Sequence, residues 1–169
     1  MSKLKILVVD DFPIFRVGLG ALLSKTADLE IIGEAENGQV AIEKARQLKP
    51  HLILMDLMMP VMGGTEAIRI IKKHQPEIKI IALTGENQLK QIQATLAAGA
   101  DGYVLKDDSN LTLLTAINSV KNDQTYLSRG ICNAVLSGSA DDSEHIRSAI
   151  SWCRLNNQEQ EEITHVVAD

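Results

Sequence analysis

Three carboxylates stand directly after two apolar runs that have the composition of buried strands. Asp10 and Asp11 follow residues 6–9, and Asp56 follows residues 52–55. The carboxyl ends of parallel strands form the binding crevice of an α/β sheet, so we expect these acids to meet at one edge. Converging carboxylates repel one another unless a cation neutralises them. The spacing therefore favours phosphoryl chemistry assisted by a divalent cation.

The elements that would position these acids alternate along the chain. Apolar runs bounded by turn residues predict strands at residues 5–9, 29–33, 51–55, 79–83 and 102–105. Segments with helical spacing follow them at residues 13–25, 39–48, 65–73, 88–98 and 110–120. Repeated strand–helix units predict an α/β fold, with a doubly wound parallel sheet and helices on both faces.

Length and charge narrow the classes of function. The chain has 169 residues, enough for one main domain and a short appendage. Its formal net charge of -5 disfavours DNA binding by this chain alone, because such binding relies on Lys and Arg that neutralise phosphates. Neither a membrane-spanning apolar stretch nor an export signal is recognisable, so we expect a cytoplasmic protein without membrane contact.

A different pattern begins after residue 121. Ser128 is placed to cap a short helix, and Leu127 would lie on the buried face of that helix. Residues 137–143 have the composition of a flexible linker. Asn156 and Glu159 have the spacing of a capping box, which predicts that a further helix begins there.

Two cysteines occur late in the chain. Cys132 and Cys153 have no His or Cys nearby at the spacing of zinc ligands. Cys153 also shares a helical stripe with Ile146, Ala149 and Ile150. We expect both cysteines to be reduced thiols that fill space in the core.

Four motifs, in this order, resemble the receiver domain of bacterial two-component response regulators. They are VVDDFP at residues 8–13, LMDLMMPVMGG at 54–64, IIALT at 80–84 and AGADGYVLKD at 98–107. The resemblance covers about residues 3–122. Details at residues 15–19 and 102–107 resemble the NarL/FixJ class, whose effector is a LuxR-type helix-turn-helix. The resemblance implies a five-stranded (βα)5 flavodoxin-like receiver fold with strand order 2-1-3-4-5, followed here by a helical C-terminal extension.

The resemblance implies a role for each matching side chain. Asp56 corresponds to the phosphoacceptor, and Lys106 to the lysine that pairs with the phosphoryl group. Thr84 corresponds to the switch hydroxyl, which bonds a phosphoryl oxygen and draws its loop inward. Tyr103 corresponds to the aromatic residue whose ring turns between exposed and buried positions as that loop moves.

The resemblance also implies a Mg²⁺ cofactor. Asp11, Asp56 and the backbone carbonyl of Met58 would bind the ion directly, with Asp10 acting through water. Backbone N–H groups at Met58 and Gly85 would complete the phosphate cradle. Without the ion, one of the converging carboxylates should take up a proton. Met58 has no polar side chain to orient water, and we expect its bulk to slow hydrolysis of the acylphosphate.

Most of these residues also have an interpretation that involves no chemistry. Asp10 or Asp11 could simply cap the helix that begins near residue 13. Thr84 could be an ordinary hydroxyl at a strand end, and Tyr103 could be core packing. Asp56 and Lys106 also stand at strand ends, and this favours a role for the acids in a functional site over helix capping alone.

The last residues are similar to the opening helix of a LuxR-type domain. Asn156 and Gln158 stand where that family has Thr and Arg. Nothing similar to a recognition helix follows before Asp169, so DNA would be read only through a complete effector domain. We expect a receiver at residues 1–122, a linker with short helices at 123–154, and the start of a truncated LuxR-type helix-turn-helix at 155–169.

The resemblance implies a signalling function. Asp56 would accept a phosphoryl group from a sensor histidine kinase, and the switch would control transcription through the effector that is incomplete here. The protein would be no enzyme beyond supporting its own aspartyl phosphorylation and dephosphorylation, and phosphorylation would favour a homodimer. An alternative is a stand-alone receiver that signals through protein contacts. An aspartyl phosphatase of the haloacid dehalogenase type would instead carry Asp-x-Asp after its first strand.

Overall fold

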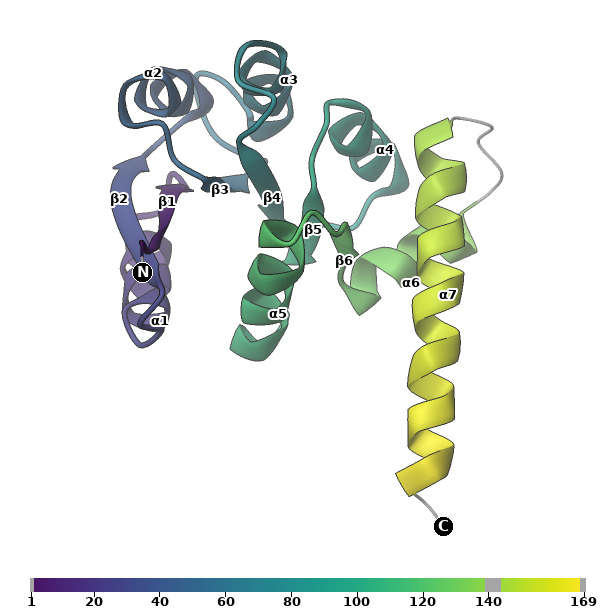
Figure 1. Cartoon of the computed structure of the whole chain (residues 1–169). Helices are drawn as coiled ribbons and strands as arrows, with labels where there is room; N and C mark the ends of the chain where they lie inside the picture. The colour runs from purple at the N-terminus through teal and green to yellow at the C-terminus, as the bar shows by residue number, and fades with distance from the viewer. Residues whose placement is uncertain (1, 139–143, 168–169) are drawn as a thin grey trace.

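A parallel sheet lies at the centre of the molecule (Figure 1). The computed structural model describes residues 2–138 and 144–167, with side chains described as far as residue 157. The strands run in the order β2-β1-β3-β4-β5-β6, which confirms the predicted order 2-1-3-4-5 and adds a sixth strand. Their bounds are β1 Leu4–Val9, β2 Leu29–Ala35, β3 Leu52–Asp56, β4 Lys79–Thr84, β5 Gly102–Leu105 and β6 Tyr126–Leu127.

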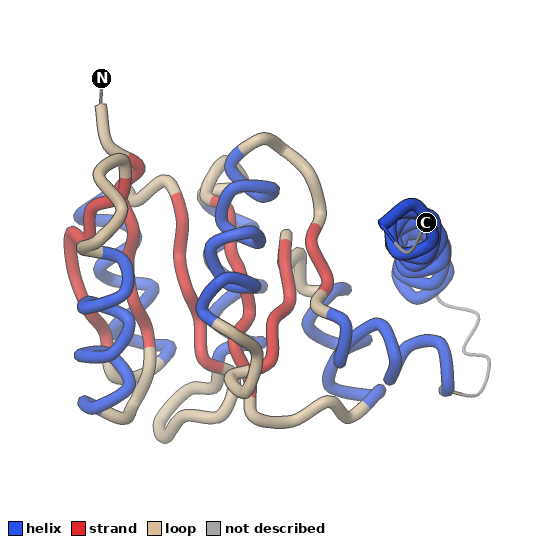
Figure 2. Tube along the Cα trace, turned by 90° about the horizontal axis from the view of Figure 1, so that it is seen from below, coloured by secondary structure: helices blue, strands red, loops and turns tan. Residues whose placement is uncertain are grey.

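Helices cover both faces of the sheet, as the strand–helix alternation predicts (Figures 1 and 2). Helices α2, α3 and α4 pack on one face, and α1 and α5 pack on the other. The helix bounds are α1 Pro13–Leu23, α2 Gly38–Leu48, α3 Gly64–His74, α4 Leu89–Ala97, α5 Asn110–Lys121, α6 Arg129–Ser137 and α7 Glu144–Val167. Among the described residues, no helix is long and apolar enough to cross a membrane.

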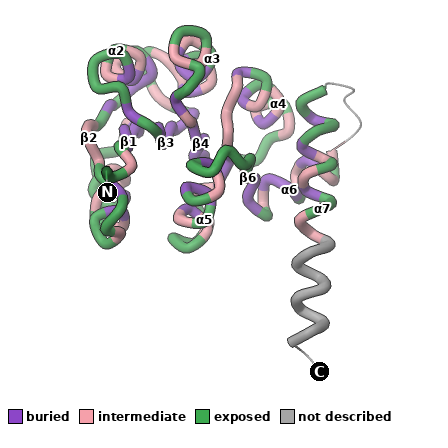
Figure 3. Tube along the Cα trace, in the orientation of Figure 1, coloured by how far each residue is buried: buried purple, intermediate pink, exposed green. Residues whose placement is uncertain are grey.

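The central strands are buried on both faces (Figure 3). In β1, Leu7 and Val9 belong to the core under α2 to α4, whereas Ile6 and Val8 belong to the core under α1 and α5. Successive side chains of a strand point to opposite faces, so a continuous apolar run supplies both cores. This two-sided burial holds the strands in one register and brings their carboxyl ends to one edge.

The segment after α5 differs from the prediction. Leu127 was expected on a helix, but Tyr126 and Leu127 form β6 and pair with Gly102 and Tyr103 of β5. A strand of two residues is too short to show an alternating pattern in sequence. Ser128 is the N-cap of α6 as expected, although its buried hydroxyl makes no capping hydrogen bond.

The expected start of a new helix at Asn156 was wrong. Helix α7 passes through this position without a break, and the Asn156 side chain donates to the carbonyl oxygen of Trp152 at 2.9 Å. A capping residue needs an extended backbone, whereas Asn156 lies inside a continuous helix. The side chain of Glu159 and residues 139–143 of the expected linker lie outside the described part of the chain.

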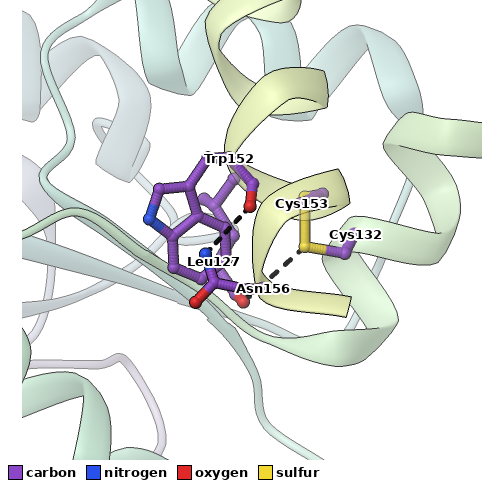
Figure 4. Close-up of a disulfide and its surroundings, with 5 residues drawn as sticks. All are labelled: Leu127, Cys132, Trp152, Cys153 and Asn156. Carbon is purple, nitrogen blue, oxygen red and sulfur yellow. Dashed lines mark hydrogen bonds between the residues drawn. A yellow bond between two sulfur atoms is a disulfide. The ribbon is translucent and has the colours of Figure 1, made fainter. Parts of the chain in front are cut away.

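The expectation of two free thiols was also wrong. Cys132 of α6 and Cys153 of α7 form a disulfide, with Cα atoms 5.4 Å apart (Figure 4). Both side chains are buried, so the expectation of core packing is confirmed. Their pairing depends on two helices meeting, which local spacing does not specify.

Candidate functional site

The three predicted carboxylates meet at the carboxyl edge of the sheet. Each of Asp10, Asp11 and Asp56 offers an oxygen atom, and these atoms lie within 4.8 Å of one another. Strands β1 and β3 are neighbours, and Val9 pairs with Met55. The acids that follow these two residues therefore lie side by side at the carboxyl edge of the sheet. Asp10 and Asp56 are buried, and Asp11 is half-buried.

Gly64 lets the first turn of α3 pack directly beneath Asp56. A Cβ atom at this position would overlap the carbonyl oxygen of Asp56. The Gly64 N–H also donates to the carbonyl oxygen of Leu57 at 3.0 Å. The paired glycines of the second motif therefore keep the loop after β3 tight, which holds the Asp56 carboxylate close to the β1 acids.

Asp10 has a structural contact in addition to its place in the cluster. Its Oδ1 accepts a hydrogen bond from the N–H of Phe12 at 2.9 Å, which fixes the turn into α1. The N-cap residue of α1 is Phe12, so Asp10 does not cap this helix. Its hydrogen bond to Phe12 belongs to the loop before α1. In contrast, Oδ1 of Asp11 is buried and has no hydrogen-bond partner among the described residues. An unpartnered buried carboxylate oxygen beside two other acids is a ligand that a hard cation prefers.

Lys106 reaches these acids from the end of β5. Its ammonium nitrogen lies 2.7 Å from Oδ2 of Asp10 and 3.3 Å from Oδ2 of Asp56. The N–H of Lys106 donates to the carbonyl oxygen of Thr84 at 2.8 Å, so pairing with β4 continues past the strand. The lysine is thus shared by two acids and contacts Asp10 more closely than Asp56.

Burial controls the protonation of Asp56. The pKa of this carboxyl is raised from 3.8 to about 6, chiefly because burial removes water from the charged form and next because of the negative charge of Asp10. The ammonium of Lys106 and a hydrogen bond from the backbone N–H of Met58 lower the pKa, but by less. This is the direction expected for converging acids, although burial contributes more to the raised pKa of Asp56 than the charge of Asp10 does.

The predicted switch residues lie on the neighbouring strands. Thr84 is the last residue of β4 and is buried, and its hydroxyl accepts from the N–H of Glu86 at 3.2 Å. Tyr103 in β5 is fully buried, and burial raises the pKa of its hydroxyl. This hydroxyl faces Thr95, which is already hydrogen-bonded to Thr65, and it makes no hydrogen bond of normal geometry within the described part of the chain. The ring is therefore in a buried position.

The backbone groups expected to cradle a phosphate lie on loops at the same edge. Met58 follows Asp56 by two residues, and its side chain is 60% exposed. The Met58 sulfur accepts a weak hydrogen bond from the Gln91 side chain at 3.6 Å, which links this loop to α4. Gly85 follows Thr84 in a bend with open space around its Cα atom.

Two residues of α1 were not predicted to serve the site. The Lys106 nitrogen lies 4.5 Å from the centre of the Phe15 ring, a cation–π contact. Arg16 donates to the carbonyl oxygen of Asp10 at 2.7 Å and forms an ion pair with Glu34 at 3.0 Å. The signals in the sequence were their position in the first turn of the helix that follows the acid pair and their place in the segment 15–19 that resembles the NarL/FixJ class.

Comparisons with known proteins agree with this geometry. Residues 6–118 match the family described as the response regulator receiver domain. Among curated proteins, response regulator protein VraR of Staphylococcus saprophyticus is 40% identical over 122 residues, which is 72% of this chain and 58% of that protein. VraR of Staphylococcus aureus is 41% identical with the same coverage. The chain therefore spans less than two thirds of the length of these relatives.

Solved structures give the same result. The RcsB response regulator of Salmonella typhimurium superimposes with a TM-score of 0.73 at 26% identity, covering 79% of this chain and 66% of that one. A two-component response regulator of the LuxR family from Aurantimonas superimposes with a TM-score of 0.75 at 29% identity, covering 79% of this chain and 95% of that one.

Proposed function

We propose that this chain, which belongs to the response regulator receiver domain family, accepts a phosphoryl group on Asp56 from the phosphohistidine of a sensor histidine kinase. The observation that carries the proposal is the buried Asp56 carboxylate, which lies beside a second buried acid and within reach of the ammonium of Lys106. A carboxylate is a weak nucleophile, so transfer needs alignment and neutralisation of the phosphoryl oxygens.

The acids fit a divalent cation, and we assign Mg²⁺ to them. Asp11, Asp56 and the carbonyl oxygen of Met58 would hold the ion directly, and Asp10 would act through water. Bound Mg²⁺ would supply positive charge next to the transferring phosphoryl group. Support comes from the all-oxygen donor set and the unpartnered Oδ1 of Asp11.

The chain's own residues would perform the remaining steps. An ionised Oδ of Asp56 attacks the phosphorus atom in line with the leaving imidazole nitrogen. The Lys106 ammonium then replaces its contact with Asp56 by a contact with a phosphoryl oxygen. Its ion pair with Asp10 keeps the ammonium near the site. The N–H groups of Met58 and Gly85 donate to the other phosphoryl oxygens. The proposed chemistry is limited to phosphorylation of Asp56 and hydrolysis of the resulting acylphosphate.

Thr84 would convert phosphorylation into a change of shape. Its hydroxyl would leave the N–H of Glu86 and donate to a phosphoryl oxygen, which draws the β4–α4 loop inward. The Tyr103 ring is buried, and it would change its position as this loop moves. A differential affinity of a few kcal/mol for the two shapes is enough to change partner binding strongly.

Output would be transcriptional control in a cytoplasmic regulator. We propose that DNA is contacted only through a complete effector domain and that phosphorylation favours a homodimer. A solved relative described as two RcsB dimers bound to two parallel DNAs supports this class of output. We keep the receiver at residues 1–122, the linker at 123–154 and the start of an effector at 155–169 as a proposed division.

The test is incubation with acetyl phosphate, with and without Mg²⁺, followed by intact mass and peptide mapping. We expect a phosphoryl adduct on Asp56 only when Mg²⁺ is present, and none in Asp56→Asn. Asp11→Asn should lower the yield through the metal, whereas Asp107→Asn changes an exposed acid next to Lys106 and should leave it unchanged. Absence of an adduct in the unaltered chain, under conditions that label another receiver, would refute the proposal.

A further inference from the structure

The disulfide joins the last helix to the rest of the fold. Cys132 lies in α6 and Cys153 in α7, and the sequence contains no other cysteine. Both side chains are buried, and Figure 4 shows the bond between the facing sides of the two helices. Any redox change in this chain that involves thiols must therefore take place at this pair.

Helix α6 rests directly on elements that flank the phosphorylation site. A Cβ atom on Gly130 would overlap Cδ1 of Leu105, the residue before Lys106. A Cβ atom on Gly138 would overlap Cδ2 of Leu89, the first residue of α4. Contacts this close transmit displacement, because a packed interface has little room to deform. The disulfide thus connects α7 to β5 and α4 through α6.

The noncovalent packing beneath α7 is incomplete. The Trp152 ring lies against Tyr126 edge to face, with ring centres 6.0 Å apart. Beside this contact is an open surface pocket of about 320 Å³, lined by Leu96, Leu127, Ala149 and Trp152 and by the polar residues Thr125, His145 and Ser148. Side chains that line an open pocket bury less apolar surface than those of a closed core, so the covalent bond has a larger share in holding α7 here.

We propose that Cys132 and Cys153 are a redox modification site, which releases α7 from α4 when the disulfide is reduced. In oxidation, a low-molecular-weight disulfide takes two electrons from the thiols and leaves as two thiols, both protons are transferred, and the Cys132–Cys153 bond forms. A small dithiol reverses the reaction and becomes a cyclic disulfide.

The chemistry of the compartment favours a switch over a permanent bond. Protein disulfides in a reducing compartment are generally transient and catalytic or redox-sensing. This step relies on the cytoplasmic location in the proposed function, whereas the release of α7 does not depend on phosphorylation. The disulfide-bonded form would also restrict movement of the β4–α4 loop, because α7 would stay packed against α4.

The test uses the full chain in mixtures of reduced and oxidised glutathione. Alkylation under denaturing conditions followed by intact mass counts free thiols, and hydrogen exchange follows residues 144–157 of α7. We expect both thiols to disappear together as the mixture becomes oxidising, and exchange of α7 to slow at least tenfold. Trp152 is the single tryptophan and lies next to Cys153, so its fluorescence should change over the same range.

Cys132→Ala provides the matched control, because it keeps the site apolar and cannot form the bond. Its α7 should exchange quickly in every mixture, and Asp56→Asn should respond like the unaltered chain. The response of Asp56→Asn separates this inference from the phosphorylation proposal, since that variant has no phosphoacceptor. Thiols that stay free throughout, glutathione adducts in place of the internal bond, or equal exchange of α7 in both states would each overturn the inference.

Discussion

The ammonium of Lys106 lies on the face of the Phe15 ring, with the nitrogen 4.5 Å from the ring centre. This contact places an aromatic residue of α1 against a lysine of the β5–α5 loop, beside Asp10 and Asp56. An aromatic face attracts a cation without competing for its hydrogen bonds. Phe15 can therefore hold the ammonium near the site while leaving its protons free for oxygen ligands.

Phe15→Leu should slow phosphorylation of Asp56 by acetyl phosphate, because the lysine loses this support. A cation–π contact contributes about 0.5–2 kcal/mol, which corresponds to a change of roughly twofold to thirtyfold. Phe15→Tyr keeps the aromatic face and should restore the rate. Phe12→Leu is the matched control, since Phe12 is exposed in the same segment. Equal rates for the leucine and tyrosine variants at position 15 would show that the ring has no positioning role.

Asp56→Asn should stabilise the metal-free protein at neutral pH. The folded state raises the pKa of Asp56 from 3.8 to about 6, so it binds the proton more tightly than the unfolded state does. Stability from this group is therefore present at low pH and is lost as pH rises from about 4 to about 6. The ionised carboxylate costs roughly 2–3 kcal/mol above that range, which the amide avoids.

Urea unfolding at several pH values, with chelator present, measures this effect. The difference in unfolding free energy between Asp56→Asn and the unaltered chain should grow across the window and then level off. Asp107→Asn provides the comparison for loss of an exposed charge nearby. A difference that does not vary with pH would contradict the raised pKa of Asp56.

Met58→Asn should shorten the lifetime of the phosphorylated Asp56. The Met58 side chain is exposed beside the acid cluster and contacts Gln91, so it covers one approach for water. An amide at this position can orient an attacking water molecule, and a shift of several-fold is expected. Loss of the phosphoryl group over time, followed by intact mass, gives the lifetime. An unchanged lifetime would show that Met58 does not shield the acylphosphate.

Val61→Asn should stabilise the fold. Val61 has φ of 68° and is 85% exposed, so a β-branched side chain occupies a left-handed backbone conformation without burying surface. Such a residue costs about 1 kcal/mol or more, and asparagine tolerates the conformation better. Thermal unfolding should show a higher midpoint for Val61→Asn and a still higher or equal one for Val61→Gly. Val17→Asn, at an exposed position of helix α1, should not raise the midpoint.

Local patterns were sufficient for the strands, the main helices and the strand ends that carry the acids. The run at residues 52–55 is apolar throughout because β3 is buried on both faces, and Asp56 is the buried acid that closes the strand. Periodicity and turn residues report such local environments directly. The family motifs then indicated the strand order and the roles of the site residues, and these roles remain predictions.

Relationships between distant segments depended on the tertiary structure. The sequence placed Lys106 near the acids, but only the packed sheet showed that it contacts Asp10 more closely than Asp56 and lies on Phe15. The Cys132–Cys153 bond required α6 and α7 to meet, and β6 required an existing edge strand with which to pair. Residue spacing encodes the periodicity of one element, whereas these contacts arise from the free energy of packing elements together.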